Sequence, residues 1–428
     1  MVDLPEKFVN RMRRELGDEA EDFFASYDAP ANKGIRVNTL KISAEDFISL
    51  SPFSLRKIDW EKNGFYVEDE KPGKTVYHAA GAYYVQEPSA MCAAPLLEVK
   101  PGERVLDLCS APGGKGTQLA QEMRGEGIIV LNEINFSRAK ILMQNVERLG
   151  VQNAVVTCAS PSKLSKNFRG YFDKILVDAP CSGEGMFKKE PNAIPEWSEE
   201  NVTACVVRQR EILLCAAEML KSGGRLVYST CTFSREEDEQ TIEDFLKKRR
   251  DFTLIKQEKL YPHRVEGEGH FAALMEKSSG DESEEVHLPE TAACVKDKKA
   301  YGLYKQFEKE YLKVSFGNIL QSGEYLYSLP LKMPETGVQI VRAGVQLCEI
   351  KGDRIEPCHA LAMCLKQDLA KCVAVDETTA VKYLSGFTFV VDEREKGWRV
   401  VTYNGLPLGW CKCVNGTAKN HLPKGLRV

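Results

Sequence analysis

Arg104-Val-Leu-Asp-Leu-Cys-Ser-Ala-Pro-Gly-Gly-Lys-Gly-Thr117 is the stretch that decides the fold of this 428-residue chain. The apolar run from Val105 to Leu108 predicts a β-strand, the small residues after it predict a tight loop, and the pattern from Gly116 to Met123 predicts a helix. Gly113 and Gly114 permit unusual dihedral angles and close backbone approach. A ligand can therefore sit against the loop amides and the N-terminus of the helix.

Two further stretches have the same form, a strand that runs into a turn with a cysteine. They are Ile175-Leu-Val-Asp-Ala-Pro-Cys-Ser-Gly-Glu-Gly185 and Arg225-Leu-Val-Tyr-Ser-Thr-Cys-Thr232. Their cysteines are Cys181 and Cys231. We expect these two turns to form the other side of the same cleft.

Strand and helix patterns alternate through the middle of the chain, which predicts an α/β fold with a doubly wound, Rossmann-like parallel sheet and helices on both faces. The expected elements are 104–108, 114–123, 127–132, 136–149, 154–158, 172–178, 198–221, 225–230 and 235–250. Such a sheet binds ligands beyond the carboxyl ends of its strands. All three turns lie at carboxyl ends, so we expect them to converge.

Composition and charge exclude several classes of protein. No apolar run approaches the roughly 18–20 residues that span a bilayer, and the first ten residues lack a signal-peptide pattern, so a cytoplasmic protein without membrane contact is expected. Fourteen cysteines without a signal peptide predict buried, reduced thiols rather than disulfides. The net charge of −4 means that any contact with nucleic acid must come from local patches.

The N-terminal part predicts a small α+β domain over residues 1–85. The expected elements are a helix over 5–26, a strand over 35–40, and strands within 53–67 joined by a turn at Asn63-Gly64. Gln86-Glu-Pro-Ser-Ala90 is expected to start a helix that ends before Lys100.

Arg36 and Asn38 alternate with Ile35 and Val37 in the strand over 35–40, so the polar pair is expected to face away from the core. Such a face is either simply solvated or contacts RNA.

The C-terminal third follows an acidic stretch at 281–285 and a Lys-rich one at 296–299. Strands are expected at 325–330 and 338–341, and the last segment has a helix pattern at 359–372 and a strand pattern at 387–403. Its end lacks acids and carries four basic residues that either contact RNA or solubilise the terminus: Lys412, Lys419, Lys424 and Arg427.

Glu133 closes the strand over 127–132, where an acid is placed to accept the ribose hydroxyls of a nucleoside-containing cofactor. The loop over 109–115 lacks both the Gly-x-Gly-x-x-Gly pattern and the phosphate-cradling Gly-Lys-Ser/Thr ending. A cofactor with an adenosine but no pyrophosphate suits this loop better, and S-adenosylmethionine is the leading example.

The cysteine turns favour methylation of a pyrimidine at carbon 5. Carbon 5 is a poor nucleophile, so a thiolate must add at carbon 6 and push electron density to carbon 5. Cys181 and Cys231 both lie in suitable turns, and the residue types alone do not choose between them. Asp178 can donate to the ring if the site raises the pKa of its carboxyl group. Six other cysteines are interpreted as buried hydrophobic residues: Cys92, Cys158, Cys205, Cys215, Cys294 and Cys348.

These motifs together resemble the Nol/Nop/Sun family of RNA cytosine-C5 methyltransferases. The resemblance covers roughly residues 30–275 and rests on six motifs in the order of the family: Arg36-Val-Asn38, Gln86-Glu-Pro-Ser89, Cys109-Ser-Ala-Pro-Gly-Gly-Lys115, Asp178-Ala-Pro-Cys-Ser-Gly-Glu-Gly185, Ser229-Thr-Cys-Thr232 and Glu268-Gly-His-Phe271. The run Gly183-Glu-Gly-Met-Phe-Lys-Lys-Glu-Pro191 and the C-terminal extension resemble the bacterial RsmF-type subgroup, which methylates 16S ribosomal RNA.

The resemblance implies roles for individual residues. Cys231 is the nucleophile, Cys181 assists elimination and product release, Asp178 binds the target cytosine, and Lys115 supports the catalytic site. The implied contacts with S-adenosylmethionine come from Cys109, Ser110, Ala111, Pro112, Gly113, Gly114, Lys115, Glu133, Arg138 and Asp178. The family has an Asp near the adenine after the third strand, where this chain has Ser160.

With the resemblance, five segments are expected. They are an N-terminal α+β RNA-binding domain (1–85), a methyltransferase domain (86–278), an acidic and basic linker (279–300), a connecting domain (301–349) and a PUA-like RNA-binding domain (350–428). The expected partner is RNA, most directly 16S ribosomal RNA or the small ribosomal subunit, and the protein is expected to be a monomer.

Four alternatives stay open: an amino-group methyltransferase, a transfer RNA substrate, a ribosome-assembly factor without catalysis, and a zinc site. The first is disfavoured because Asp178-Ala-Pro-Cys181 has neither a second Pro nor an aromatic residue to stack on the base. A zinc site is disfavoured because its candidate ligands lack paired Cys-x-x-Cys spacing. These ligands are Cys411 and Cys413 with His421, or Cys358 with His359 and Cys364.

Overall fold

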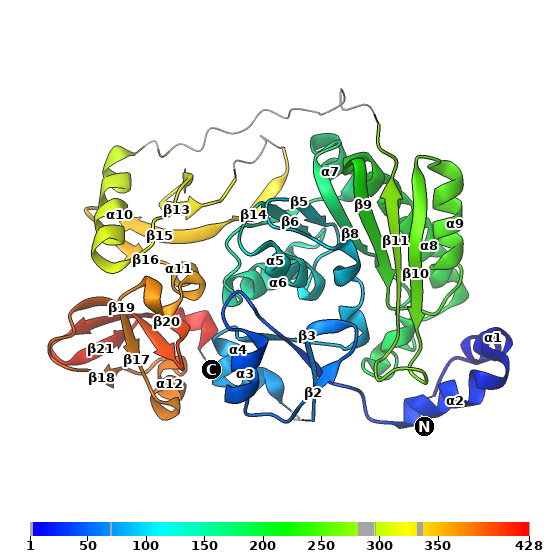
Figure 1. The fold of residues 1–428 in the computed structure, drawn as a ribbon, viewed down its shortest axis with the longest axis horizontal. Coiled ribbons are helices and arrows are strands. Elements are labelled where there is room, and N and C mark those ends of the chain that lie inside the picture. Colours follow the sequence, from blue (N-terminus) through cyan, green and yellow to red (C-terminus); the bar gives the residue numbers. More distant parts are fainter. Residues whose placement is uncertain (1–2, 69–70, 281–294, 296, 332–336, 428) are drawn as a thin grey trace.

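The structure is a computed structural model that describes residues 3–68, 71–280, 295, 297–331 and 337–427. Its centre is an eight-stranded sheet with the order β10-β11-β9-β8-β5-β6-β7-β14 (Figure 1). The five strands of its middle are parallel: β5 (Arg104–Asp107), β6 (Ile128–Asn132), β7 (Ala154–Cys158), β8 (Phe172–Asp178) and β9 (Leu220–Thr230). The doubly wound, Rossmann-like α/β fold is therefore confirmed.

Helices cover both faces of this sheet. They are α5 (Gly114–Met123), α6 (Phe136–Arg148), α7 (Pro161–Asn167), α8 (Glu199–Met219) and α9 (Glu239–Lys248). Leu119 and Leu142 of α5 and α6 belong to one apolar cluster, whereas Leu164 and Leu213 of α7 and α8 belong to another. Nearly continuous apolar runs, such as Ile128-Ile-Val-Leu131, form the strands because both faces of the sheet are buried.

Antiparallel strands extend the sheet at its two ends. β10 (Phe252–Leu260) and β11 (His270–Lys277) form a hairpin beside β9, and β14 (Gln339–Ala343) pairs with β7. The sequence pattern predicted a strand at 338–341 but not this partner. The segment after the expected linker therefore completes the central sheet, while most of the linker itself lies outside the described residues.

The N-terminal region contains a four-stranded antiparallel sheet of order β2-β3-β1-β4. Its elements are α1 (Glu6–Leu16), α2 (Ala20–Ala25), β1 (Gly34–Val37), α3 (Ala44–Leu50), β2 (Leu55–Ile58), β3 (Glu61–Val67), α4 (Val76–Ala79) and β4 (Tyr83–Gln86). The single helix expected over 5–26 is wrong, because Gly17 adopts a φ of 55° and ends α1.

Two other expectations for this region are wrong. Asn63 and Gly64 lie inside β3, where Gly64 pairs with Arg36, so the hairpin turn falls earlier, between Ile58 and Glu61. No long helix follows Gln86. Two short 3₁₀ turns, Ser89–Met91 and Ala94–Leu97, take its place, because prolines at 88 and 95 cannot donate the hydrogen bonds that a helix needs.

Arg36 and Asn38 are buried, with exposed fractions of 1% each, so the expectation that they face away from the core is wrong. The Arg36 guanidinium donates to Gln121 Oε1 at 2.7 Å, to Thr117 Oγ1 at 2.9 Å and to the Gly114 carbonyl at 2.7 Å, all in α5. Both faces of β1 are covered, since α5 packs on the side that the alternation left for solvent. Arg36 joins the N-terminal sheet to α5, and the buried side chains of Arg36 and Asn38 are not available to RNA.

Asn38 makes the matching contact with α6. Its Nδ2 atom donates to the carbonyls of Gly81 and Leu149, both at 2.8 Å. The N-terminal sheet is therefore fastened to α5 and α6, the two helices on one face of the central sheet.

The C-terminal region contains two more sheets, with orders β12-β13-β15-β16 and β17-β19-β20-β21-β18. Its strands are β12 (Ile319–Ser322), β13 (Tyr325–Ser328), β15 (Val345–Lys351), β16 (Arg354–Pro357), β17 (Cys372–Ala374), β18 (Phe389–Val390), β19 (Gly397–Tyr403), β20 (Leu406–Val414) and β21 (Thr417–Asn420). Its helices are α10 (Lys298–Tyr311), α11 (His359–Cys364) and α12 (Glu377–Leu384). The helix expected over 359–372 ends at Cys364, because residues 372–374 pair with β19 instead.

The last sheet packs against the N-terminal region, as Figure 1 shows near α4 and α12. Asn404 Nδ2 donates to the Tyr77 hydroxyl at 2.7 Å, and the rings of Tyr77 and Tyr403 lie 5.2 Å apart. Within the described residues, no helix is both long and apolar enough to cross a membrane.

We expect Arg36→Met to lower the free energy of unfolding by about 3 kcal/mol, because it leaves buried acceptors in α5 without their charged donor. Urea denaturation followed by circular dichroism measures this loss. Arg56→Met is the matched control: Arg56 is exposed and pairs with the exposed Glu266, so its loss should stay below about 1 kcal/mol. Equal losses for the two variants would contradict the assignment.

Candidate active site

The first wall of the site is the loop that joins β5 to α5. Gly113 has a φ of 111°, and a Cβ atom there would lie 2.9 Å from Leu142 Cδ1, so only glycine fits. The Ser110 amide donates to the Asn132 carbonyl at 2.8 Å, and Asn132 Nδ2 donates to the Leu108 carbonyl at 3.0 Å. The end of β6 therefore holds the loop in place.

Glu133 and Arg138 stand at the edge of this loop, as the sequence predicted. The Glu133 carboxylate is buried and lies 3.3 Å from Arg138 Nη1. Arg138 Nη2 donates to the Ala111 carbonyl at 2.8 Å, so the arginine links the acid to the loop. This geometry leaves the buried Glu133 carboxylate at the end of β6, the second parallel strand in chain order, where the hydroxyl groups of a ribose can bind.

Two buried polar side chains, Asp107 and Ser110, lie at the base of this wall. The Ser110 hydroxyl and the Cys109 backbone are hydrogen-bonding neighbours that lower the pKa of Asp107, less than burial raises it. Both side chains face Gly116, where an added Cβ would lie 2.7 Å from Asp107 Oδ2 and 2.6 Å from Ser110 Oγ. Burial raises the pKa of Asp107 to about 7. Such atoms suit a ligand that carries its own donors and acceptors, as an amino acid joined to an adenosine does.

The second wall carries Asp178 at the end of β8. Lys115 Nζ lies 2.8 Å from Asp178 Oδ2, and the Ser229 hydroxyl donates to Asp178 Oδ1 at 2.8 Å. Lys115 is 9% exposed, whereas the Asp178 side chain keeps 33% of its surface exposed. The carboxylate therefore keeps an exposed side between the two walls, and the Lys115 ammonium balances its charge from the buried side.

The condition under which Asp178 could donate to the ring, a raised pKa, is not met. Burial alone would raise this pKa, but the Lys115 ammonium and the hydrogen bond from Ser229 lower it by more, so it lies below its usual value. Asp178 is ionised at neutral pH and accepts hydrogen bonds. It is not the donor to the ring that the sequence suggested.

His270 is a neighbour of Asp178 that residue-by-residue reasoning did not single out. Its Nε2 atom lies 3.8 Å from Asp178 Oδ1, and both ring nitrogens are buried without a hydrogen-bond partner among the described residues. Burial and the Lys115 charge lower the pKa of His270 to about 3, so the ring is neutral. The sequence did contain a signal that could have identified His270, because this residue belongs to the Glu268-Gly-His-Phe271 motif.

The two cysteine turns meet between these walls. Cys181 Sγ and Cys231 Sγ lie 3.3 Å apart, and both side chains are partly exposed. The contact with Cys231, together with burial, raises the pKa of Cys181 well above its usual value. In this pair Cys181 therefore keeps its proton and can donate it toward the Cys231 sulfur.

A buried polar network that the sequence did not reveal holds the two turns together. The Ser182 amide donates to Glu237 at 2.9 Å, and the Ser182 and Thr232 hydroxyls lie 2.8 Å apart. Gln209 Nε2 donates both to Glu237 Oε1 at 2.9 Å and to the Pro180 carbonyl at 3.1 Å. Glu237, in the loop after Cys231, thus holds the Cys181 turn through Ser182, and Ser182 in turn contacts Thr232 beside Cys231.

The remaining candidates lie elsewhere. Ser160 accepts from the Lys163 amide at 3.3 Å and caps α7. Cys92, Cys205 and Cys348 are buried, whereas Cys158 and Cys215 are half-buried, and Cys294 lies outside the described residues.

The proposed zinc ligands do not form a cluster. Cys411 Sγ and Cys413 Sγ lie 3.9 Å apart, while His421 Nδ1 faces Glu356 Oε1 at 3.1 Å. Nowhere in the described part of the chain do three His, Cys, Asp or Glu side chains form a group able to hold a metal ion.

Four family models match successive regions that together make up most of the chain. Residues 94–276 match the model of 16S rRNA methyltransferase RsmB/F. Residues 4–88 match the N-terminal domain of 16S rRNA methyltransferase RsmF, residues 306–365 match its first C-terminal domain, and residues 370–428 match its PUA domain.

Individual relatives match over the full length. Ribosomal RNA small subunit methyltransferase F of Shewanella loihica is 32% identical over 473 aligned positions, which cover 100% of this chain and 96% of the relative. The protein of the same name from Vibrio vulnificus is 31% identical, with 99% and 98% covered.

Solved structures share the fold. A methyltransferase homolog protein from Pyrococcus horikoshii has a TM-score of 0.59 at 31% identity, covering 64% of this chain and 96% of its own. The structure of NSun6 from the same organism has a TM-score of 0.58 at 22% identity, covering 64% and 99%.

We expect Lys115→Met to invert the contribution of Asp178 to stability. In the native protein the pKa of Asp178 is lowered, so its stabilising effect is present above about pH 4 and is lost as the pH falls. Without the ammonium, burial dominates and raises this pKa, so the variant should lose stability relative to the native protein as the pH rises from 4 to 7, by about 1–2 kcal/mol.

Urea denaturation at several pH values measures this difference. Lys163→Met, at an exposed position of α7, is the control and should show no trend with pH. A constant difference between Lys115→Met and the native protein across this range would contradict the role of Lys115 as the counter-charge of Asp178.

Proposed function

Because the chain belongs to the family of 16S rRNA methyltransferases that includes small subunit methyltransferase F, we propose that it methylates carbon 5 of a cytosine in 16S ribosomal RNA through a covalent adduct at Cys231. It is an S-adenosylmethionine-dependent RNA methyltransferase. The observation that supports the adduct is the pair of thiols 3.3 Å apart beside the Lys115–Asp178 ion pair.

The residues of the first wall suit S-adenosylmethionine. Glu133 would hold the ribose hydroxyls, and the buried polar pair of Asp107 and Ser110 lies at the base of the same loop. Ser160 caps α7 and keeps a hydroxyl near the end of β7, without the charge that strengthens a hydrogen bond to an amino group. When bound, the cofactor supplies the electrophilic methyl group.

Cys231 starts the reaction. Its thiolate adds to carbon 6 of the cytosine, and the electron pair of the 5,6 double bond becomes available at carbon 5, which takes the methyl group. Cys181 keeps its own proton, because its pKa is raised, and its S–H group can stabilise the negative sulfur of Cys231. The pair therefore separates the roles of nucleophile and proton donor between two like residues.

Asp178 gives specificity for cytosine. An ionised carboxylate accepts a hydrogen bond from the amino group of cytosine but repels the carbonyl oxygen that uracil has at the same place. Lys115 keeps the carboxylate ionised, because its ammonium lowers the pKa of Asp178. The ammonium can also stabilise negative charge that develops on the ring.

The last steps regenerate the enzyme. The proton on carbon 5 must leave with its electron pair staying to reform the 5,6 double bond, and the bond between carbon 6 and Cys231 breaks at the same time. Cys181 is close enough to take part, since its sulfur lies 3.3 Å from the leaving sulfur. Its S–H group gives its proton to the departing Cys231 sulfur, and the Cys181 thiolate so formed, a strong base because its pKa is raised, takes up the proton from carbon 5.

RNA must reach a thiol that is partly buried, so the target base has to leave its stack, at a cost of a few kcal/mol. RNA contacts elsewhere on the protein offset this cost, and the PUA domain is one source of them. The four basic residues at its end are exposed, as a contact with RNA requires: Lys412, Lys419, Lys424 and Arg427. We place the reaction in the cytoplasm, with the small ribosomal subunit or its RNA as substrate and a monomer as the active form.

We expect Cys231→Ser to abolish methylation while the fold and cofactor binding persist, because a hydroxyl is a far weaker nucleophile than a thiolate at neutral pH. A strain without the gene is complemented with the native protein or the variant, and bisulfite sequencing of its 16S ribosomal RNA reads 5-methylcytosine. Cys215→Ser, a half-buried cysteine of α8, is the control and should complement fully. A cytosine that is still methylated by Cys231→Ser would exclude the adduct, and a site found only in transfer RNA would exclude ribosomal RNA as the substrate.

We expect Cys181→Ala to release product at least 100-fold more slowly and to accumulate a covalent complex with RNA. The reason is that addition to carbon 6 needs only Cys231, whereas elimination loses its assisting thiol. Denaturing gel electrophoresis with unmethylated 16S transcript and S-adenosylmethionine detects the complex as a slower band. Cys181→Ala combined with Cys231→Ser should give no such band, and normal turnover by Cys181→Ala would contradict the assigned role.

A further inference from the structure

The two N-terminal helices pack on the catalytic turns rather than on the N-terminal sheet. In Figure 1, α1 and α2 lie beside the lower end of the β10–β11 hairpin and away from β2 and β3. Their apolar side chains share one cluster with residues of the cysteine turns and of the segments after them: Phe8, Met12, Phe23, Tyr27, Phe187, Trp197, Val202 and Phe233. The helices are therefore part of the support of the active site.

Glu184 is the polar centre of this contact. Its carboxylate is fully buried and accepts from Trp197 Nε1 at 2.8 Å and from the Phe233 amide at 3.1 Å. Arg11 Nη2, from α1, lies 2.6 Å from Glu184 Oε2. Among the described residues, Arg11 is the cation that forms an ion pair with this carboxylate.

The bond between Glu184 and Phe233 is one of two backbone-directed bonds that join residues 184 and 185 to the turn of the nucleophile. The Gly185 amide donates to the carbonyl of Cys231 itself at 2.9 Å. Glu184 thus binds Phe233, two residues after Cys231, and Gly185 binds Cys231 itself. A Cβ atom on Gly185 would lie 3.0 Å from the Cys231 carbonyl oxygen, so the two segments are in close contact.

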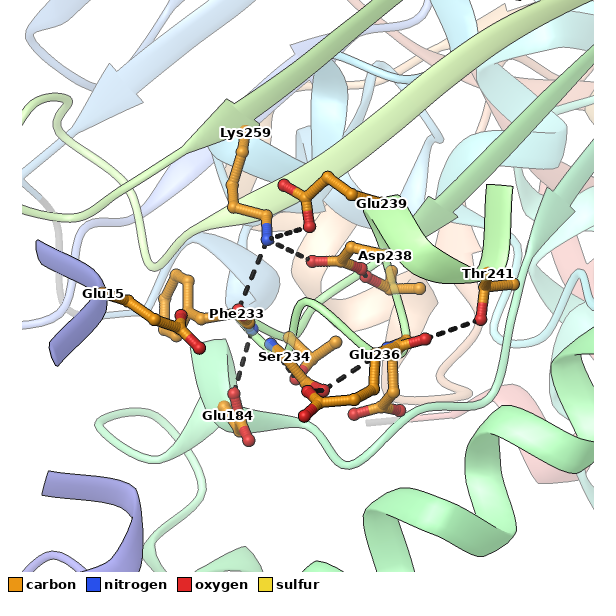
Figure 2. A network of polar contacts seen from close by, with 12 residues as sticks. Glu15, Glu184, Phe233, Ser234, Glu236, Asp238, Glu239, Thr241 and Lys259 are labelled. Atoms are coloured by element: carbon orange, nitrogen blue, oxygen red, sulfur yellow. Dashed lines mark hydrogen bonds and ion pairs between the residues drawn. The ribbon is translucent and has the colours of Figure 1, made fainter. Parts of the chain in front are cut away.

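Figure 2 shows how Phe233 is held from its other side. Its carbonyl accepts from Lys259 Nζ at 3.3 Å, and the same ammonium lies 2.8 Å from Asp238 Oδ2. The Phe233 ring stacks on Tyr261 with centroids 5.4 Å apart and meets the edge of Phe23, from α2, at 5.2 Å. The turn after Cys231 is therefore held by β10, by the Cys181 turn and by the N-terminal helices.

We propose that Arg11 is a positioning residue for methyl transfer: its guanidinium neutralises Glu184, which in turn holds the turn that carries Cys231. The proposal rests on the proposed function of Cys231. Burial lowers the pKa of Arg11, but Glu184 raises it by more, so the guanidinium stays charged. Besides Glu184, Arg11 lies near Glu15 and the rings of Phe8 and Trp197, and among the described residues no contact joins it to the cofactor loop or the thiols, so it acts on Cys231 through Glu184.

Removing Arg11 leaves a buried carboxylate without a counter-charge. A carboxylate in this position takes up a proton or draws in water, and either change weakens its acceptance of the Phe233 amide. The sulfur of Cys231 then samples more positions, and a displacement on the order of 1 Å is enough to slow a reaction about 100-fold. The cofactor loop, which Arg11 does not contact, keeps its shape.

The test compares Arg11→Met, Glu184→Gln and the double variant. RNA in which the target cytosine carries fluorine at carbon 5 traps the adduct, because fluorine cannot leave as the proton does, and the rate of adduct formation reports the attack by Cys231. We expect Arg11→Met to slow this rate at least 10-fold, with the dissociation constant of S-adenosylmethionine, measured by calorimetry, unchanged within twofold. Adding Glu184→Gln to Arg11→Met should recover at least threefold, because a neutral amide needs no counter-charge and its one oxygen can still accept from the Phe233 amide, although the bond from Trp197 is lost.

Arg13→Met is the matched control on the same helix. Arg13 is exposed and pairs with the exposed Glu21, so this variant should form the adduct at the native rate. Native adduct formation by Arg11→Met, a parallel loss of cofactor binding, or no recovery in the double variant would each overturn the proposal. If the native protein itself formed no adduct, the proposed function would fail instead, so the two failures are distinguishable.

Discussion

Parallel pairing of β5, β8 and β9 is the constraint from which the site follows. Neighbouring parallel strands end at the same edge of the sheet, so the three turns that follow them must lie side by side. The order of the sheet reverses direction between β5 and β8, which opens the space where a ligand fits. Cys181 and Cys231 come within 3.3 Å of each other because β8 and β9 are adjacent, although 50 residues separate them in the chain.

The sequence predicted this part of the fold closely. The expected strands 154–158 and 172–178 coincide with β7 and β8. They were predictable because a strand buried on both faces has a sequence of a few consecutive apolar residues with clear ends. The positions of Lys115, Asp178 and the two cysteines at one edge were predictable for the same reason. Local pattern and sheet geometry point to the same answer here, since the alternation of strand and helix leaves few ways to connect the chain.

What the sequence did not predict depends on contacts between distant segments. Arg36 looked solvent-facing because alternation in a strand cannot show that a second domain covers the other face. Gly64 looked like a turn residue, but it lies inside β3, opposite Arg36. Glu184 and Glu237 read as ordinary acids of a loop, and only the folded chain shows that they are buried acceptors near the turns of Cys181 and Cys231. Such residues are specified by their partners, and their partners are far away in the chain.

The acids of the site show why residue type alone cannot assign chemistry. Asp107 and Asp178 both close strands of the same sheet and burial acts to raise the pKa of both, yet the pKa of Asp107 rises to about 7 while that of Asp178 falls. The difference comes from one ammonium group, since Lys115 lies 2.8 Å from Asp178. A single cation therefore keeps Asp178 charged, while the pKa of Asp107 lies near neutral pH. Because Lys115 sits in the first turn of α5, the end of the β5–α5 loop also sets the charge of Asp178 at the end of β8.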